Sequence, residues 1–110
     1  MKNTITIGLC KGRHDIPYVE DYIFPTEIDP LGLEVMNLKI HEKLQHADAV
    51  VLYVTGLTVA CTQVIAYCVS NLIPITLMHF DRESGEYYPQ IILSSGQVFI
   101  AKSDYGMESL

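Results

Sequence analysis

An apolar run that ends at a single glycine constrains the fold of this chain more than any other feature. Residues 49–54 read Ala-Val-Val-Leu-Tyr-Val, which is typical of a strand covered on both faces. Gly56 breaks the run. Residues 58–69 then form a stretch that is apolar nearly all round, which predicts a helix packed deep against a sheet. A strand, a glycine turn and a buried helix in this order indicate an α/β domain.

The other segments extend this pattern. We predict strands at residues 4–10, 73–80, 87–93 and 97–101, and a helix at residues 34–45 with Val35, Leu38 and Leu44 as its apolar positions. Pro89 cannot donate to a strand ladder, so residues 87–93 are expected at an edge or a bulge. Residues 11–30 contain three prolines and form either a functional loop or a short element that the pattern does not place.

Alternating strands and helices predict a parallel central sheet with right-handed crossovers, in the order strand, helix, strand, helix, strand. The C-terminal strands add an antiparallel edge, and the whole forms two or three layers. A chain of 110 residues fits one domain, which we place at residues 1–101, with a polar tail at 102–110. Because 49% of the residues are hydrophobic, we expect part of the surface to be covered in a homodimer or higher homo-oligomer.

Charge and cysteine content exclude several classes of protein. The formal net charge of −6 disfavours long nucleic acids, which are held by many phosphate contacts, although a small anion needs only a few donors. Three cysteines without a CxxC pair or a secretory signal indicate reduced, mostly buried thiols and a cytoplasmic location. No window approaches the roughly 20 apolar residues of a membrane-spanning helix, so no membrane partner is expected.

Ligands of open parallel sheets bind beyond the carboxyl ends of the strands, and this rule selects three segments. Lys11, Gly12, Arg13 and His14 follow the first strand; Thr55, Gly56, Leu57 and Thr58 follow the second; and His79, Asp81 and Arg82 end the third. Three of the seven basic residues of the chain fall in these segments. The sequence therefore predicts an anion site at this edge, if the three segments meet.

The glycine turn has the best-defined physical basis. A short turn from a strand into a helix leaves backbone N–H groups unpaired, and the helix dipole favours an anion beside them. Gly56 permits a positive φ or a close backbone approach, while Thr55 and Thr58 can cap the helix or bind a ligand. A plain threonine-capped turn is the alternative. We expect Gly56→Val to block the anion and leave the fold largely intact.

Catalysis at this edge would need a proton carrier. His14 or His79 can act as general acid or base near neutral pH, and Asp81 can orient the histidine or bind a divalent metal. No HxH, HExxH or CxxC spacing indicates a preformed metal site, so we predict no metal ligands. The alternatives are a solvated loop at residues 11–14, a strand histidine satisfied by a neighbour, and an aspartate that begins a turn.

Tyrosines near the same edge offer a surface for a base. Tyr53 lies near the end of the second strand. Tyr87 and Tyr88 begin the predicted strand at residues 87–93, directly after a turn. Such rings can stack on a nucleobase, or they can pack in a core or an oligomer interface.

Residues 49–90 resemble the small CRISPR-associated proteins of the CARF-like, ring-nuclease type, which have a Rossmann-like fold. The resemblance rests on Val50-Val51-Leu52-Tyr53-Val54-Thr55-Gly56, the buried helix, and Ile75-Thr76-Leu77-Met78-His79-Phe80-Asp81-Arg82 before a turn with Gly85. Proteins of this type enclose cyclic oligoadenylate second messengers of antiviral defence, and some cleave them. The resemblance implies that Thr55, Gly56 and Thr58 touch phosphates and that Asp81 lies near the reacting centre.

The turn of this chain has Leu57-Thr58 where one such family has an arginine and a proline-aromatic pair, so the sequence favours binding over cleavage. The leading hypothesis is therefore binding of a small nucleotide, with either sequestration or phosphodiester hydrolysis. One alternative is a non-catalytic scaffold that pairs through residues 87–93. The other is an enzyme similar to nucleoside deoxyribosyltransferases, in which Gln63 stands nearest to the position of the catalytic glutamate.

Overall fold

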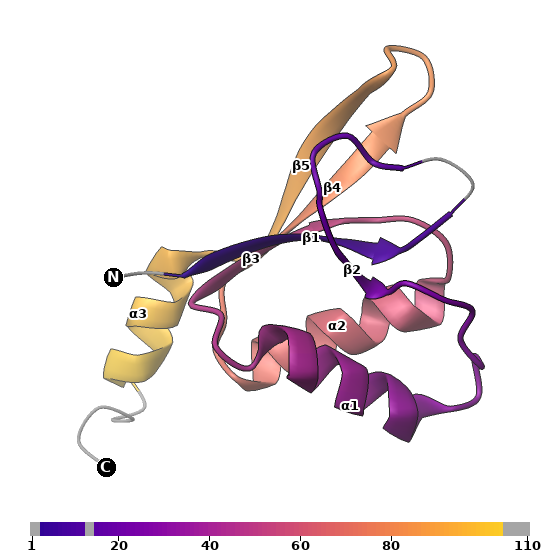
Figure 1. The fold of residues 1–110 in the computed structure, drawn as a ribbon. Helices are drawn as coiled ribbons and strands as arrows, with labels where there is room; N and C mark the ends of the chain where they lie inside the picture. Colours follow the sequence, from indigo (N-terminus) through magenta and orange to yellow (C-terminus); the bar gives the residue numbers. More distant parts are fainter. Residues whose placement is uncertain (1–2, 13–14, 105–110) are drawn as a thin grey trace.

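The computed structural model describes residues 3–12 and 15–104, which form one five-stranded sheet and three helices (Figure 1). The strands are β1 (Thr4–Cys10), β2 (Tyr22–Phe24), β3 (Ala49–Tyr53), β4 (Ile75–Asp81) and β5 (Glu86–Leu93). The helices are α1 (Leu33–Leu44), α2 (Thr58–Ser70) and α3 (Ser95–Asp104). The spatial order of the strands is β2-β1-β3-β4-β5, with β1 pairing parallel to both β2 and β3.

The predicted fold class is confirmed. β3 and β4 are parallel, and β4 and β5 form the antiparallel pair at the C-terminal edge of a Rossmann-like α/β sheet. The long segment after β1 contains the short strand β2, whose three residues are all buried. Among the residues that the structure describes, no helix combines the length and the hydropathy needed to cross a membrane.

α1 and α2 lie side by side on one face of the sheet, below it in Figure 1, so the domain has two layers. Alternate strand residues such as Ile7, Leu52 and Leu77 point toward the helices and are 3% exposed or less. Met36 and Val64 meet them from the two helices in the same core. This cluster is the main core of the domain.

The helix positions that the sequence assigned to the core of α1 are wrong in two of three cases. Val35 is 57% exposed and Leu38 is 70% exposed, whereas Met36, Ile40 and Leu44 are buried. The buried residues recur every fourth position and so follow one side of the helix. α2 is also buried on one side only: Val64 is buried, whereas Val69 is 43% exposed.

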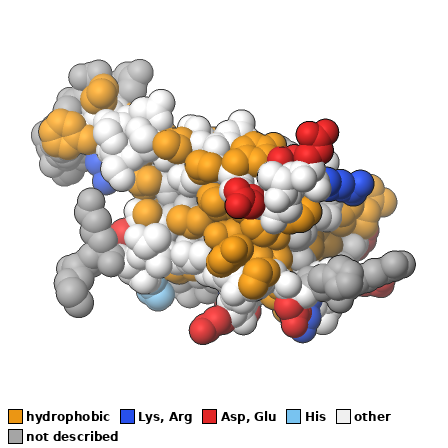
Figure 2. Space-filling view, turned by 90° about the horizontal axis from the view of Figure 1, so that it is seen from above, with side chains coloured by type: hydrophobic (Ala, Val, Ile, Leu, Met, Phe, Trp, Pro, Cys, Tyr) orange, Lys and Arg blue, Asp and Glu red, His pale blue; other side chains and the backbone are white. Residues whose placement is uncertain are grey.

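Among the described residues no helix covers the face of the sheet opposite α1 and α2, where Tyr53 of β3 is buried and Val51 half-buried, so the expectation that β3 is covered on both faces is confirmed in part. Part of this face lies under the segment between β1 and β2, where Ile16 packs with Tyr22 and Tyr53. The remainder is open. Figure 2 shows hydrophobic side chains gathered on this side of the molecule, and exposed Phe80 and Ile91 stand on alternate positions of β4 and β5 that belong to it.

The C-terminal segment is a helix, so the predicted strand at residues 97–101 is wrong, and the predicted tail begins inside α3. The Ser94 hydroxyl accepts from the Gln97 backbone N–H at 3.1 Å, and the Gln97 side chain accepts from the Ser94 N–H at 2.8 Å. This reciprocal pair is a capping box, which starts the helix. Val98 is buried, while Phe99 is 68% exposed.

β5 is the edge strand that Pro89 predicted. Pro89 stands opposite Met78, whose carbonyl accepts from the Val54 N–H on the β3 side. In an antiparallel pair, two opposite residues point their backbone groups either both toward each other or both away from each other. Because those of Met78 point away from β5, those of Pro89 point away from β4, and its missing N–H faces the outer edge. The proline therefore breaks no ladder bond, and it removes a donor that a partner strand would use.

Candidate functional site

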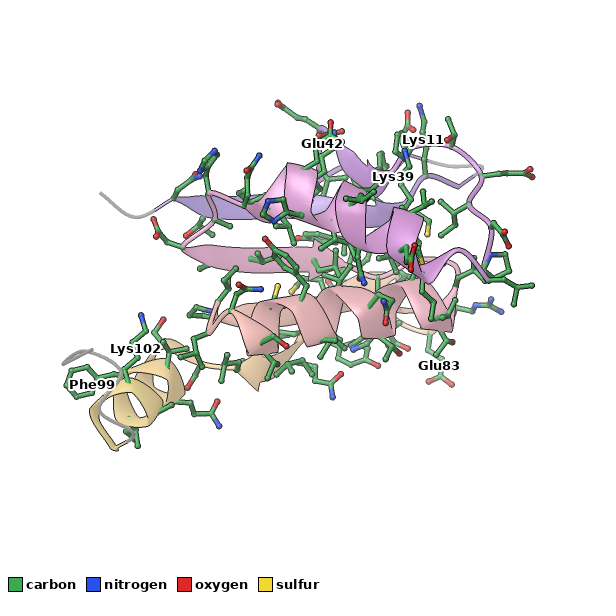
Figure 3. The ribbon with its side chains drawn as sticks, turned by 90° about the horizontal axis from the view of Figure 1, so that it is seen from below. Lys11, Lys39, Glu42, Glu83, Phe99 and Lys102 are labelled. Carbon is green, nitrogen blue, oxygen red and sulfur yellow. The ribbon has the colours of Figure 1, made fainter. Side chains whose placement is uncertain are left out.

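The carboxyl ends of β1, β3 and β4 lie at one end of the sheet, and two cavities adjoin there. Figure 3 shows Lys11 and Glu83 at this end, with Phe99 and Lys102 of α3 at the opposite end. The loop after β1 contributes Lys11 to the first cavity and Gly12 to the second. The loop after β3 contributes Gly56 to the first cavity and Thr55 to the second. These two loops therefore form a shared wall.

Thr55 ties the two loops together. Its hydroxyl donates to the Cys10 carbonyl at 2.5 Å and accepts from the Cys10 N–H at 3.2 Å. The hydroxyl thus joins the ends of two neighbouring strands, so of the two roles predicted for it, helix capping or ligand binding, the first is wrong. Thr58 does not cap α2 either, because Leu57 stands at the N-cap position and makes no side-chain cap hydrogen bond.

Gly56 has the positive φ that the sequence predicts, +76°. A Cβ at this position would lie 3.3 Å from Cys10 Cβ, so the glycine also allows a close approach to β1. Valine is disfavoured at such a φ because its β-branch crowds the backbone. We therefore correct the expectation for Gly56→Val: this substitution would disturb the fold as well as the site.

The amino terminus of α2 faces this edge without a side-chain partner. The first turn of the helix contains no acidic residue, and the N-cap residue Leu57 is in extended conformation with φ −72° and ψ 127°. The first N–H groups of a helix have no partner within the helix. They therefore remain available to an anion.

The Lys11 cavity occupies the side of the shared wall nearer to α2. Its volume is about 440 Å³, and its lining residues are Cys10, Lys11, Thr26, Glu27, Ile28, Gly56 and Leu57. Lys11 provides a cation and Glu27 a carboxylate, and both side chains are exposed. Burial raises the pKa of the Cys10 thiol, against a smaller opposing effect of the hydrogen bond from the Leu57 backbone. Cys10 is thus a poor thiolate nucleophile.

The aromatic cavity occupies the other side, under the segment between β1 and β2. Its volume is about 500 Å³, and its lining residues are Gly12, Asp15, Ile16, Pro17, Tyr18, Thr55, Phe80, Gly85 and Tyr87. Burial raises the pKa of the Tyr87 phenol, and the neighbouring Tyr53 adds to the shift, so the ring stays neutral at physiological pH. The three strand-end segments meet in this cavity through Gly12, Thr55 and Phe80.

The predicted third segment contributes differently from expectation. His79 points to the helix-facing side of the β4–β5 pair, where its Nε2 lies 2.7 Å from Gln90 Oε1, and it lines neither cavity. Asp81 accepts from the backbone N–H groups of Glu83 and Ser84 at 3.3 and 3.2 Å. Hydrogen bonding from the Ser84 side chain and from these N–H groups lowers the pKa of Asp81. The Asp81 carboxylate therefore holds the β4–β5 turn.

The remaining predicted residues divide into three groups. Leu57 lines the Lys11 cavity, and Thr58 is exposed at the first position of α2. Arg82 is exposed in the β4–β5 turn and lines neither cavity. Arg13 and His14 lie outside the described residues. Within residues 3–12 and 15–104, no group of three histidine, cysteine, aspartate or glutamate side chains is placed to hold a metal ion.

A larger groove of about 720 Å³ runs between α1 and α2, away from the strand ends. Gln63 lies there, and its amide donates to Asn37 Oδ1 at 2.9 Å. Nearby, His41 Nδ1 lies 3.1 Å from the Tyr67 hydroxyl. None of the predicted strand-end residues lines this groove, and the Gln63 amide offers no nucleophile. The deoxyribosyltransferase-like alternative therefore gains no support.

The sequence reading missed the segment that roofs the aromatic cavity. Asp15, Ile16 and Tyr18 had no motif, because their grouping depends on how the connection after β1 folds back over the sheet. The available signal was Gly8 within a strand, which suggests a close approach. A Cβ there would lie 2.4 Å from a ring carbon of Tyr22, so the glycine makes room for that ring.

Tyr22 in turn fixes the roof. Its hydroxyl accepts from the Ile16 N–H at 2.9 Å, and Ile16 is 5% exposed.

No family model, curated protein or solved structure matches this chain. The site is therefore defined by its own geometry: two adjoining cavities, one with a lysine and a free helix terminus and one lined by aromatic rings.

Proposed function

We propose that this protein binds a small anionic nucleotide across the wall between the two cavities, with the phosphate in the Lys11 cavity and the base in the aromatic cavity. The observation that carries the proposal is the adjacency of a cavity that holds Lys11 at a helix amino terminus and an aromatic cavity of comparable size. A nucleotide has the same two parts, a charged group and a flat ring, joined by a sugar.

Electrostatics favour a small ligand over a polymer. Lys11 and the first N–H groups of α2 attract a phosphate locally, whereas Glu27 and the overall charge of −6 oppose a long run of phosphates. Glu27 can accept hydrogen bonds from sugar hydroxyls in the same cavity. Cyclic oligonucleotides of the kind bound by CARF-like proteins belong to this class of compact ligand, and the resemblance of residues 49–90 supports testing them.

Binding has more support than hydrolysis. His79 is engaged with Gln90 and lines neither cavity, and the Asp81 carboxylate is occupied by the turn. Of the predicted catalytic side chains that the structure describes, neither is therefore placed to carry a proton in either cavity. The scaffold alternative, pairing through β5, is opposed by the outward-facing Pro89.

Leu57 provides the sharpest test because binding and folding should respond in opposite directions. The Leu57→Asp variant places a carboxylate at an N-cap position with suitable extended conformation, which should stabilise α2 by about 1 kcal/mol. The same carboxylate would occupy the phosphate position and repel the ligand. Leu57→Asn is the matched control, because asparagine caps equally well without charge.

The protein should be titrated calorimetrically with adenosine monophosphate, cyclic di-adenylate and cyclic tetra-adenylate. We expect Leu57→Asp to abolish binding at raised thermal stability, and Leu57→Asn, whose amide caps the same N–H groups without repelling a phosphate, to weaken binding far less. Lys11→Gln should weaken binding about tenfold, whereas Lys102→Gln, the same charge change at the opposite end of the molecule, should not. Absence of binding by the wild-type protein to all three probes would overturn the proposal, and chromatography of bound ligand would separate sequestration from cleavage.

A further inference from the structure

We infer that the aromatic cavity selects its base through Asp15, and that it favours a base with an exocyclic amino group over one with a carbonyl oxygen at that position. This inference rests on the proposed nucleotide binding and specifies which base is bound. It follows from the geometry of the rings, the anchored position of Ile16 beside Asp15, and the identity of the one charged side chain among the described lining residues.

The rings are arranged to present aromatic faces. Tyr18 stacks on Tyr53 with centroids 5.7 Å apart and an interplanar angle of 25°, and Tyr53 meets Tyr87 edge-on at 4.9 Å. Phe80 lies 5.2 Å from Tyr87 at 60°. Tyr53 is buried and anchors the group, whereas Tyr18 and Phe80 are 63% and 51% exposed. Exposed faces held by a buried ring form a stacking surface for a planar ligand.

The cavity is limited to a small ligand. A volume of about 500 Å³ falls within the ordinary range of small-molecule sites. Its hydrophobic lining includes Ile16, Pro17 and the rings, and the Thr55 hydroxyl is already engaged with Cys10. Among the described lining residues, Asp15 is the one acidic or basic side chain. The Tyr18 and Tyr87 hydroxyls can each donate or accept, so Asp15 is the side chain of the described lining that distinguishes a donor from an acceptor.

The backbone next to Asp15 is held in place. The Ile16 N–H donates to the Tyr22 hydroxyl, and the Ile16 carbonyl accepts from the Val19 N–H at 3.3 Å. Tyr22 and Ile16 both belong to the second buried cluster. Asp15 therefore lines the cavity next to an anchored residue.

A carboxylate offers hydrogen-bond acceptors only, so it accepts from an amino group and repels a carbonyl oxygen. Adenine and hypoxanthine differ at this position: adenine carries an amino group where hypoxanthine carries an oxygen. A binding site that pairs with one group leaves the other unsatisfied, and the penalty for an unpaired polar group exceeds the gain from a typical hydrogen bond. Asparagine at position 15 offers both a donor and an acceptor and should remove the discrimination.

The test compares adenosine monophosphate with inosine monophosphate on the wild-type protein, Asp15→Asn and the control Glu20→Gln, which removes an exposed charge from the same loop outside the lining. We expect the wild-type protein and Glu20→Gln to bind the adenosine nucleotide about tenfold more tightly, and Asp15→Asn to bind the two within about twofold. Equal affinities in the wild-type protein, or an unchanged ratio in Asp15→Asn, would overturn the inference while leaving nucleotide binding in place. Failure of both nucleotides to bind the wild-type protein would instead count against the proposed function itself.

Discussion

At the scale of single residues, the candidate site depends on positions where the backbone needs glycine. Gly56 and Gly85 both have positive φ, +76° and +73°, but their surroundings differ. A Cβ on Gly56 would lie 3.3 Å from Cys10 Cβ, whereas a Cβ on Gly85 would meet nothing within 4 Å. The pair therefore separates the cost of backbone conformation from the cost of crowding.

We expect Gly85→Ala to lower the free energy of unfolding by about 1 kcal/mol, the usual cost of left-handed backbone for a residue with a Cβ. Gly56→Ala should cost about 1 kcal/mol more, because Cys10 is held by Thr55 and must also move. Urea unfolding of the two variants against the wild-type protein measures both values. Equal losses would mean that the contact with Cys10 relaxes freely and that only φ requires glycine at position 56.

The sequence predicted the positive φ of Gly56 because a glycine between a strand and a helix has few other roles. It could not predict that Gly8 accommodates the Tyr22 ring, because the two residues meet only after β2 pairs with β1. It also placed Thr55 at the helix cap, where the hydroxyl instead bonds across to Cys10. Contacts between strands depend on register, which residue type alone does not specify.

At the scale of elements, the sequence predicts the long segments with a clear hydrophobic pattern and fails for the short ones. β1, β3 and α2 are long enough to show a pattern, whereas β2 has three residues and is buried by its neighbours. The sequence predicts a strand in place of α3 because Val98, Phe99 and Ile100 form a short apolar run. Such runs do not separate strand from helix. The capping box at Ser94 and Gln97 was the deciding signal, and it lies just before the run.

If this capping box starts α3, its removal should unravel the helix without affecting the sheet. We expect Ser94→Ala to lower the free energy of unfolding by about 1 kcal/mol and to reduce the helical signal in far-ultraviolet circular dichroism. Ser95→Ala is the control, since Ser95 is exposed and one position beyond the cap. A larger effect of Ser95→Ala than of Ser94→Ala would contradict the assigned cap.

At the scale of the whole molecule, a two-layer fold leaves one face of the sheet without a helix. The segment between β1 and β2 covers the part near Tyr53, and this partial cover creates the aromatic cavity. The sequence selected the three strand-end segments and left open whether they meet. It could not predict that Phe80, rather than His79, would face the cavity, because neighbouring strand residues point to opposite faces and a shift of one position exchanges them.

The homo-oligomer expected from the composition stays a prediction, and the uncovered part of this face is where we expect two copies of the chain to meet. Ile91 is 64% exposed on β5, beside half-buried Met78 and Val51 of the neighbouring strands on the same face. A second copy that covered this face would remove these side chains from water, and one buried lysine would oppose that association strongly. Ile91→Lys should therefore shift the protein toward monomer in sedimentation velocity over the micromolar range. Leu38→Lys makes the same change at a 70% exposed position on the helical face and should leave association unchanged. A wild-type protein that is monomeric throughout that range, or a response to Leu38→Lys alone, would show that the open sheet face is not where copies of this chain meet.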